Sequence, residues 1–170
     1  GPPRFAIAFQ TSNQKVTHPF MNEIIVIPFP KTLWHRLLAT LLEELLSPVG
    51  IQVYTDLPLL SKPPEADILL LRRHTPHWTP EQLLRLPDGI RESQASHILI
   101  EFKYTESVNE EAFLQTLSYD TIYKRAKHLK AIHVQTVLVS SKTPLTETLT
   151  EWGYAGTHQA GVYRSQERSM

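Results

Sequence analysis

One run of residues limits the fold of this chain more than any other. The segment His97–Tyr104 has the composition of a β-strand, in which successive side chains point to opposite faces of a sheet. One face of this strand is wholly apolar and must be core. The other begins with Leu99 and ends with Glu101 and Lys103. A carboxylate and an ammonium on a half-buried face cost several kcal/mol unless they are paired, hydrated or bound to a metal.

The segments around this strand predict an α/β domain over residues 31–170, with residues 1–30 forming an N-terminal arm or an extra strand, including a strand at 23–27. The expected elements in chain order are a helix at 32–46, strands at 51–55, 67–71 and 97–104, a helix at 108–128 and a strand at 134–140. This order predicts a single domain with a mixed β-sheet flanked by helices, in which the last strand returns through a helical crossover.

Two smaller features complete the expected fold. Residues 72–96 form an insertion between the second and third core strands, and Thr79 with Gln82 forms a capping box that starts a short helix there. A second capping box, Ser107 with Glu110, is expected to start the long helix. A closing hairpin is expected between Tyr154 and Tyr163.

Composition excludes several classes of protein. The chain has no Cys, so a disulfide scaffold and a thiolate metal site are ruled out. Its 17 Lys and Arg balance 17 Asp and Glu, so nucleic acid would have to bind at a local basic patch. This balance leads to the hypothesis that a homodimer or larger assembly supplies further basic surface. No apolar run reaches membrane-spanning length and no signal peptide is evident, so we expect a cytoplasmic protein with no membrane partner.

A second acid stands at the head of the neighbouring strand. Asp67 comes directly before an apolar run, and if that strand pairs with 97–104, Asp67 can lie near Glu101. Two convergent carboxylates repel each other, which favours a hard divalent cation such as Mg²⁺ or Mn²⁺. The cation would polarise a phosphoryl oxygen and lower the pKa of a bound water. Lys103 would then stabilise charge that grows on the phosphate, or hold the attacking water.

This pattern resembles the PD-(D/E)XK nuclease superfamily over residues 32–140, although Ala66 stands where the motif has Pro. The resemblance implies an α-β-β-β-α-β core of the restriction-endonuclease type and a metal-dependent hydrolase of DNA. Asp67 and Glu101 would be the metal ligands and Lys103 the catalytic lysine. Asp67 keeps this role only if residues 72–96 are an excursion between two paired strands.

Two further positions carry the resemblance. Gln115 and Tyr119 match the Gln-x-x-x-Tyr helix of RecB-type exonucleases, which implies that they touch substrate or steady the site. Alternatively, they share an ordinary packing stripe with Ile122 and Ala126. Some members also supply a Glu from the first helix, and Glu44 is the better candidate because it flanks the apolar stripe; the alternative is a surface Glu.

Basic residues offer contacts to a nucleic-acid backbone. Lys124, Arg125 and Lys127 cluster near the end of the long helix, where they bind phosphate or simply complement the helix C-terminus. Arg72 and Arg73 follow the Asp67 strand and could contact phosphate near the site; otherwise they are loop charges.

The sequence therefore predicts a Mg²⁺-dependent deoxyribonuclease. The alternative is a catalytically inactive member of the same fold, acting as a nucleic-acid-binding or protein-interaction module. A third reading is a toxin or mobile-element protein whose nuclease needs a partner.

Overall fold

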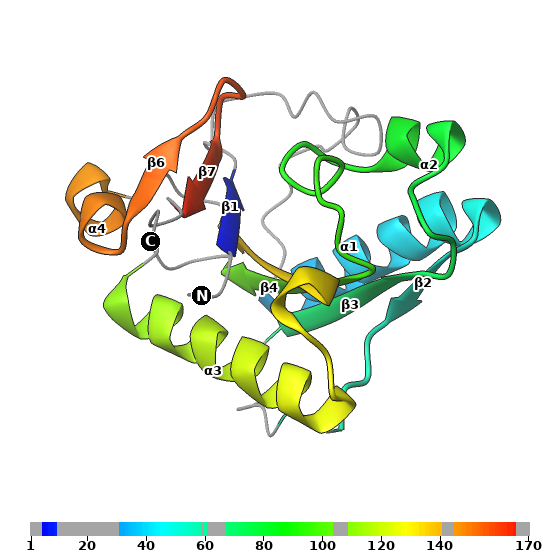
Figure 1. Cartoon of the computed structure of the whole chain (residues 1–170), viewed down its shortest axis with the longest axis horizontal. Helices are drawn as coiled ribbons and strands as arrows, with labels where there is room; N and C mark the ends of the chain where they lie inside the picture. Colours follow the sequence, from blue (N-terminus) through cyan, green and yellow to red (C-terminus); the bar gives the residue numbers. More distant parts are fainter. Residues whose placement is uncertain are drawn as a thin grey trace.

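A mixed sheet of seven strands, in the order β2-β3-β4-β5-β1-β7-β6, forms the body of the molecule (Figure 1). The computed structural model describes residues 5–9, 31–58, 60, 67–103, 109–140 and 145–165. The strands are β1 Phe5–Phe9, β2 Ile51–Tyr54, β3 Asp67–Arg73, β4 His97–Lys103, β5 Val134–Ser140, β6 Tyr154–Gly156 and β7 Val162–Ser165. The helices are α1 Lys31–Leu46, α2 Pro80–Arg85, α3 Glu110–Lys127 and α4 Thr146–Glu151, with short 3₁₀ turns at Ser47–Val49 and Ala131–His133.

The central elements follow the expected order. Strands β2, β3 and β4 pair antiparallel one after another, and β4 pairs parallel with β5 after the crossover through α3. The segment 74–96 is an excursion between β3 and β4, which are direct neighbours in the sheet. The expectation of a single α/β domain with a mixed, helix-flanked sheet is confirmed.

The rest of the sheet is built by the two ends of the described chain. Strand β1 pairs parallel with β5 and antiparallel with β7, so residues 5–9 contribute an extra strand to the sheet. Strands β6 and β7 form the expected closing hairpin, which turns at Gly161 with a φ of 81°. The strand expected at 23–27 lies outside the described residues.

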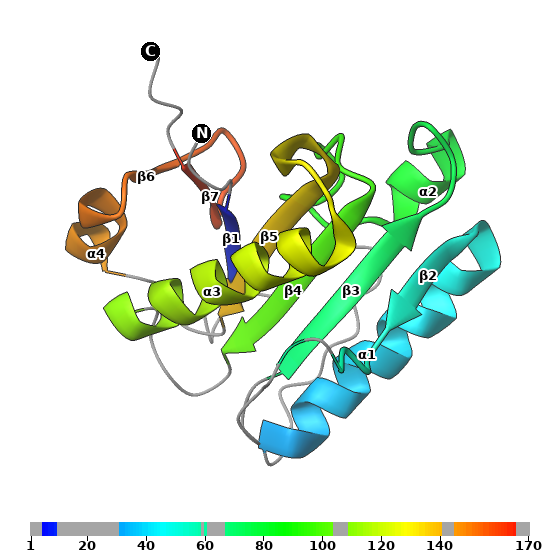
Figure 2. The same cartoon turned by 60° about the horizontal axis from the view of Figure 1, so that its bottom comes forward.

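Helices α1 and α3 cover opposite faces of the sheet (Figure 2). Leu42 and Leu46 of α1 pack with Ile98, Ile100 and Phe102 of β4. On the other face, the α3 side chains pack against Leu99, Leu138 and their neighbours. The alternation within β4 is therefore as expected, and Glu101 belongs to the face covered by α3. None of the described helices has the length and apolarity to cross a membrane.

The long helix α3 begins two residues later than its sequence suggests. Its N-cap is Asn109, whose side chain accepts a hydrogen bond from the Ala112 N–H at 2.9 Å. The N-cap is therefore Asn109 and not the expected Ser107, because an Asn at this position satisfies an amide of the first turn directly. The helix ends at Lys127, and its C-cap His128 adopts the left-handed conformation with a φ of 55°.

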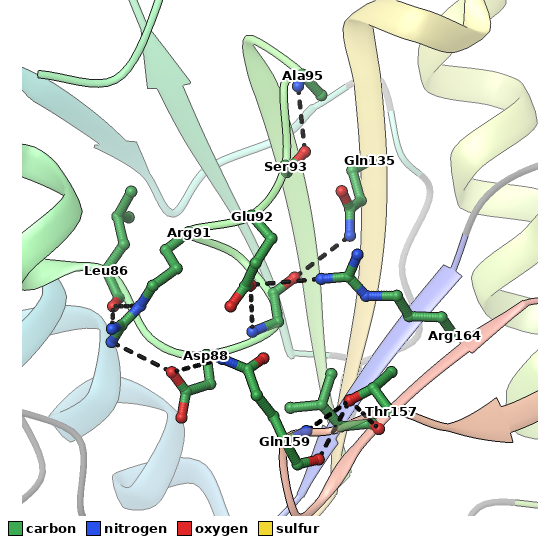
Figure 3. Close-up of polar contacts among 12 residues, drawn as sticks. Leu86, Asp88, Arg91, Glu92, Ser93, Ala95, Gln135, Thr157, Gln159 and Arg164 are labelled. Carbon is green, nitrogen blue, oxygen red and sulfur yellow. Dashed lines mark hydrogen bonds and ion pairs between the residues drawn. The ribbon is translucent and has the colours of Figure 1, made fainter.

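The insertion is tied to the C-terminal hairpin by polar contacts (Figure 3). The Arg164 guanidinium lies 3.4 Å from the Glu92 carboxylate, and the Gln159 amide donates to Asp88 at 3.3 Å. Within the insertion, the capping box expected at Thr79 and Gln82 is present. Contacts between such distant segments fix the excursion against the sheet, so that β3 and β4 can remain neighbours.

Candidate active site

The ladder between β3 and β4 brings the two acidic positions of the sequence close together. Its register pairs Asp67 with Phe102 and Ile68 with Glu101. Asp67 and Glu101 therefore lie on adjacent strands, one position apart along the ladder. The pairing of the two strands, which the metal hypothesis needs, is present, but it does not by itself bring the two carboxylates together.

The same register sets a condition on any shared metal site. Directly opposed residues of an antiparallel pair share a face, and positions one step apart alternate between faces. Phe102 packs on the α1 side and Glu101 on the α3 side. Because Asp67 is opposite Phe102 and is the first residue of β3, joint coordination requires the backbone at Asp67 to depart from regular alternation.

Glu101 is a buried carboxylate held by the helix above it. Glu101 is 2% exposed, and its Oε2 accepts a hydrogen bond from the Thr116 hydroxyl at 2.5 Å. Thr116 is itself 1% exposed, and its Oγ1 also lies 2.8 Å from the Ala112 carbonyl oxygen of the preceding turn. A helix hydroxyl thus fixes the carboxylate near the end of β4, where burial without a donor would be costly.

Tyr119 lies close enough to Glu101 to be affected by its charge, and Gln115 is hydrogen-bonded to Tyr119. Burial raises the pKa of Tyr119 above its ordinary value of 10.0, and the negative charge of Glu101 raises it further. A hydrogen bond with Gln115 acts in the opposite direction. The structure therefore brings Glu101, Thr116, Tyr119 and Gln115 into one cluster at the junction of β4 and α3.

The packing alternative for this helix is only partly correct. Ile122 is 44% exposed and Ala126 is also exposed, so Gln115 and Tyr119 do not share a buried stripe with them. The buried face of α3 instead consists of Ala112, Phe113, Thr116, Tyr119, Asp120 and Tyr123.

Lys103 and Glu44 have different relations to the cluster. Lys103 is the last residue of β4, two positions after Glu101, and its backbone pairs with Ser140 of β5. Glu44 is exposed near the C-terminal end of α1. That helix covers the face opposite Glu101, and its end meets α2 through the bond from Arg85 to the Leu45 carbonyl at 2.9 Å. The structure does not bring Glu44 to the cluster.

Arg73 has a structural role in place of the phosphate contact expected from the sequence. It is 7% exposed, and its guanidinium donates to the carbonyl oxygens of Thr75, Pro76, Gln94 and Ala95 at 2.8–3.2 Å. It also lies 4.7 Å from the ring centroid of Trp78, which is buried and donates to the Ser93 carbonyl at 2.7 Å. Arg73 therefore holds both ends of the insertion to the sheet.

The remaining basic residues divide into two kinds. Lys124 is mostly buried, and its ammonium contacts the Asp120 carboxylate at 2.7 Å. Arg125, Lys127 and Arg72 are exposed and remain accessible for a charged ligand. Lys124 is thus bound within the protein, which leaves the other three as candidate contacts to phosphate.

Sequence reasoning missed two buried polar residues of α3. Thr116 contacts Glu101, and Asp120 is 1% exposed and accepts hydrogen bonds from Thr136 at 2.6 Å and from Lys124. The signal was present, because both lie at helical spacing from Ala112 and Tyr123, which are apolar or aromatic. Such spacing places polar residues on the buried face.

The donor set determines which cation the cluster could accept. Among the residues whose side chains are described, no group of three His, Asp or Glu side chains could hold a metal ion. A cation would therefore need Glu101 and Asp67 as ligands, and the side chain of Asp67 lies outside the described part of the chain. Two carboxylates suit Mg²⁺ or Mn²⁺, which keep several positions for water and phosphate.

Comparisons of the chain with family models, with curated proteins and with solved structures gave no match. What the cluster does must therefore be argued from its own chemistry.

Proposed function

We propose that this chain is a Mg²⁺-dependent nuclease of the PD-(D/E)XK type, which hydrolyses phosphodiester bonds of DNA. The observation that carries the proposal is the environment of Glu101. A buried carboxylate stands near the end of a central strand, held by Thr116 and flanked by Tyr119, with an Asp on the neighbouring strand. Glutamate is rarely fully buried unless it is paired, and a buried carboxylate beside a second acid is typical of a functional site.

Each residue has a role in the proposal. Asp67 and Glu101 would hold Mg²⁺ or Mn²⁺, which polarises the scissile phosphate and lowers the pKa of an attacking water. Thr116 fixes the orientation of the Glu101 carboxylate. Lys103 would donate to a phosphate oxygen or hold the water. Gln115 and Tyr119 would contact the substrate strand or keep the carboxylate in place.

The proposed partner is DNA, bound through exposed cations. Arg72, Arg125 and Lys127 are exposed and would contact the phosphate backbone. A net charge of zero makes this basic surface small, so we propose that a second copy or a larger assembly extends it. We also propose a cytoplasmic location, since a chain without Cys has no disulfide to lose there.

One observation favours a second candidate function, the catalytically inactive module. The β3–β4 register places Asp67 opposite Phe102 rather than opposite Glu101. If alternation continues to the first residue of β3, the two carboxylates do not meet. The fold would then serve to bind nucleic acid or protein without cleavage.

Cleavage assays with matched variants separate the two functions. Supercoiled plasmid, single-stranded DNA and RNA are incubated with the wild type in Mg²⁺, in Mn²⁺ and in EDTA. Glu101→Gln and Lys103→Ala remove the proposed ligand and the proposed lysine. Glu111→Gln and Lys130→Ala make the same changes at exposed positions on α3 and after it.

The nuclease proposal predicts metal-dependent cleavage that falls at least about a hundredfold in the first two variants and less than twofold in the controls. Equal behaviour of the wild type and all four variants supports the inactive module. Preference among the three nucleic acids identifies the substrate.

A further inference from the structure

A second site lies away from the Glu101 cluster, at the other end of β4. A cavity of 610 Å³ opens between the ends of β2 and β3, the loop that follows β2 and the last turns of α3. Its lining includes His97, the first residue of β4, whereas Glu101 is four positions further along the strand. At about 3.3 Å per residue, this separation is about 13 Å. The cavity and the candidate active site are therefore distinct places on one face of the sheet.

Cationic groups converge on this cavity from two elements. Arg72 of β3 and Lys127 of α3 both line it and are exposed. The β3–β4 register puts Arg72 opposite His97, so the two side chains share a face. Burial lowers the pKa of His97, and the charge of the neighbouring Arg72 lowers it further. Asp56 is the single carboxylate among the described lining residues, so the balance favours an anion.

Aromatic and apolar side chains form the rest of the lining. Tyr54 and Tyr123 contribute rings, and the Tyr123 ring lies 6.1 Å from the His97 ring at an interplanar angle of 55°. The Tyr54 hydroxyl donates to Gln52 Oε1 at 2.5 Å, which fixes that ring at the edge of the sheet. Leu70 is 5% exposed and is among the leucines that supply an apolar surface. These groups suit a ligand in which a flat, weakly polar ring is attached to an anionic group.

We infer that this cavity binds a nucleotide, with its phosphate at Arg72 and Lys127 and its base against the partly exposed ring of Tyr54. The volume is within the range of about 300–1,000 Å³ that is typical of small-ligand sites. Arginine and lysine form charge-assisted hydrogen bonds with phosphate, and aromatic side chains stack on a base of any sequence. The nucleotide is either free or part of a single strand. Its binding needs neither a metal nor cleavage, so this site and the proposed active site are tested separately.

Isothermal titration calorimetry of the full chain in EDTA tests the site. The probes are 2′-deoxyadenosine 5′-monophosphate, 2′-deoxyadenosine, inorganic phosphate and an unphosphorylated single-stranded oligonucleotide. The variants are Arg72→Gln and Lys127→Gln, and the matched control is Lys130→Gln, which is exposed just after α3 but does not line the cavity. Thermal melting of each variant verifies that the fold is intact. The same titration is repeated with Glu101→Gln, which lacks the proposed metal ligand, so that binding at the cavity is measured apart from the proposed active site.

Saturable binding of the mononucleotide is expected, weakened about tenfold in each of the two variants and less than twofold in Lys130→Gln. Removing the phosphate or the base should each weaken binding by a similar factor. An oligonucleotide that displaces the mononucleotide at lower concentration identifies a strand as the ligand, and one that fails to displace it identifies a free nucleotide. Lack of saturation at about 1 mM, or equal loss in Lys130→Gln, overturns the assignment.

Discussion

Replacing Arg73 with Met tests how the insertion between β3 and β4 is held. The change keeps a long side chain but removes the guanidinium and its four bonds to carbonyl oxygens. We expect Arg73→Met to lower the free energy of unfolding and to loosen the insertion. Arg72→Met is the matched control, because it changes the adjacent residue, which is exposed.

The expected magnitude follows from what each acceptor can do after the change. The contact to the Ala95 carbonyl is buried, whereas the other three are partly exposed and can bind water instead. One buried acceptor left without a donor costs about 1–3 kcal/mol. Loss of the contact with the Trp78 ring adds about 0.5–1 kcal/mol. The sum, about 1.5–4 kcal/mol, is partly offset because Met needs no desolvation of a charge.

Urea unfolding of the two variants and the wild type measures this difference. A loss of that size lowers the urea midpoint by about 1–2 M, and the control should change the free energy of unfolding by less than about 0.5 kcal/mol. Stability of Arg73→Met within about 0.5 kcal/mol of the wild type would refute the anchoring role. Equal losses in both variants would refute it too, because they would point to net charge rather than to the four bonds.

Three further predictions concern α3 and the cavity. Thr116→Val should lower stability by about 1–2 kcal/mol in urea unfolding and reduce any cleavage, because a buried carboxylate loses its donor; Ser118→Ala, which removes an exposed hydroxyl, should change neither. Lys124→Met should cost about 1–2 kcal/mol in the same assay, because the buried Asp120 carboxylate loses its cation; a neutral result would show that this pair contributes nothing. Burial holds the pKa of His97 below its ordinary value of 6.5, so the unfolded state takes up this proton first, and the free energy of unfolding falls as the pH drops below 6.5. His97→Gln should show a smaller fall in pH-dependent melting, and an identical pH profile would contradict this assignment.

Periodicity and turn chemistry predicted the central part of the fold. The apolar run at 134–140 is strand β5 within the same limits, and the alternation of 97–104 assigned the two faces of β4 correctly. The prolines and the capping box at Thr79 marked the insertion, because their backbone preferences act locally. These features depend on neighbours in sequence, which is why the sequence of one chain was enough to predict them.

Features that depend on tertiary contacts were not predicted. Nothing local indicates that Arg73 turns inward, because its carbonyl partners come from both ends of the insertion. The pairing of β1 with β5 joins segments more than a hundred residues apart. The packing stripe considered for α3, through Gln115 and Ile122, is one position away from buried residues Thr116 and Tyr123. The buried Asp120 was not foreseen, because its partner Thr136 lies on another element.

The position of a metal ion tests the proposed nuclease most directly. Crystals grown with Mn²⁺ and measured at the manganese absorption edge would show the ion as an anomalous peak. The proposal predicts a peak at about 2.1 Å from carboxylate oxygens of both Asp67 and Glu101, absent in Glu101→Gln. A crystal saturated with Mn²⁺ that shows no peak at these carboxylates would contradict the proposal. An Asp67 side chain on the α1 side of the sheet would contradict it as well.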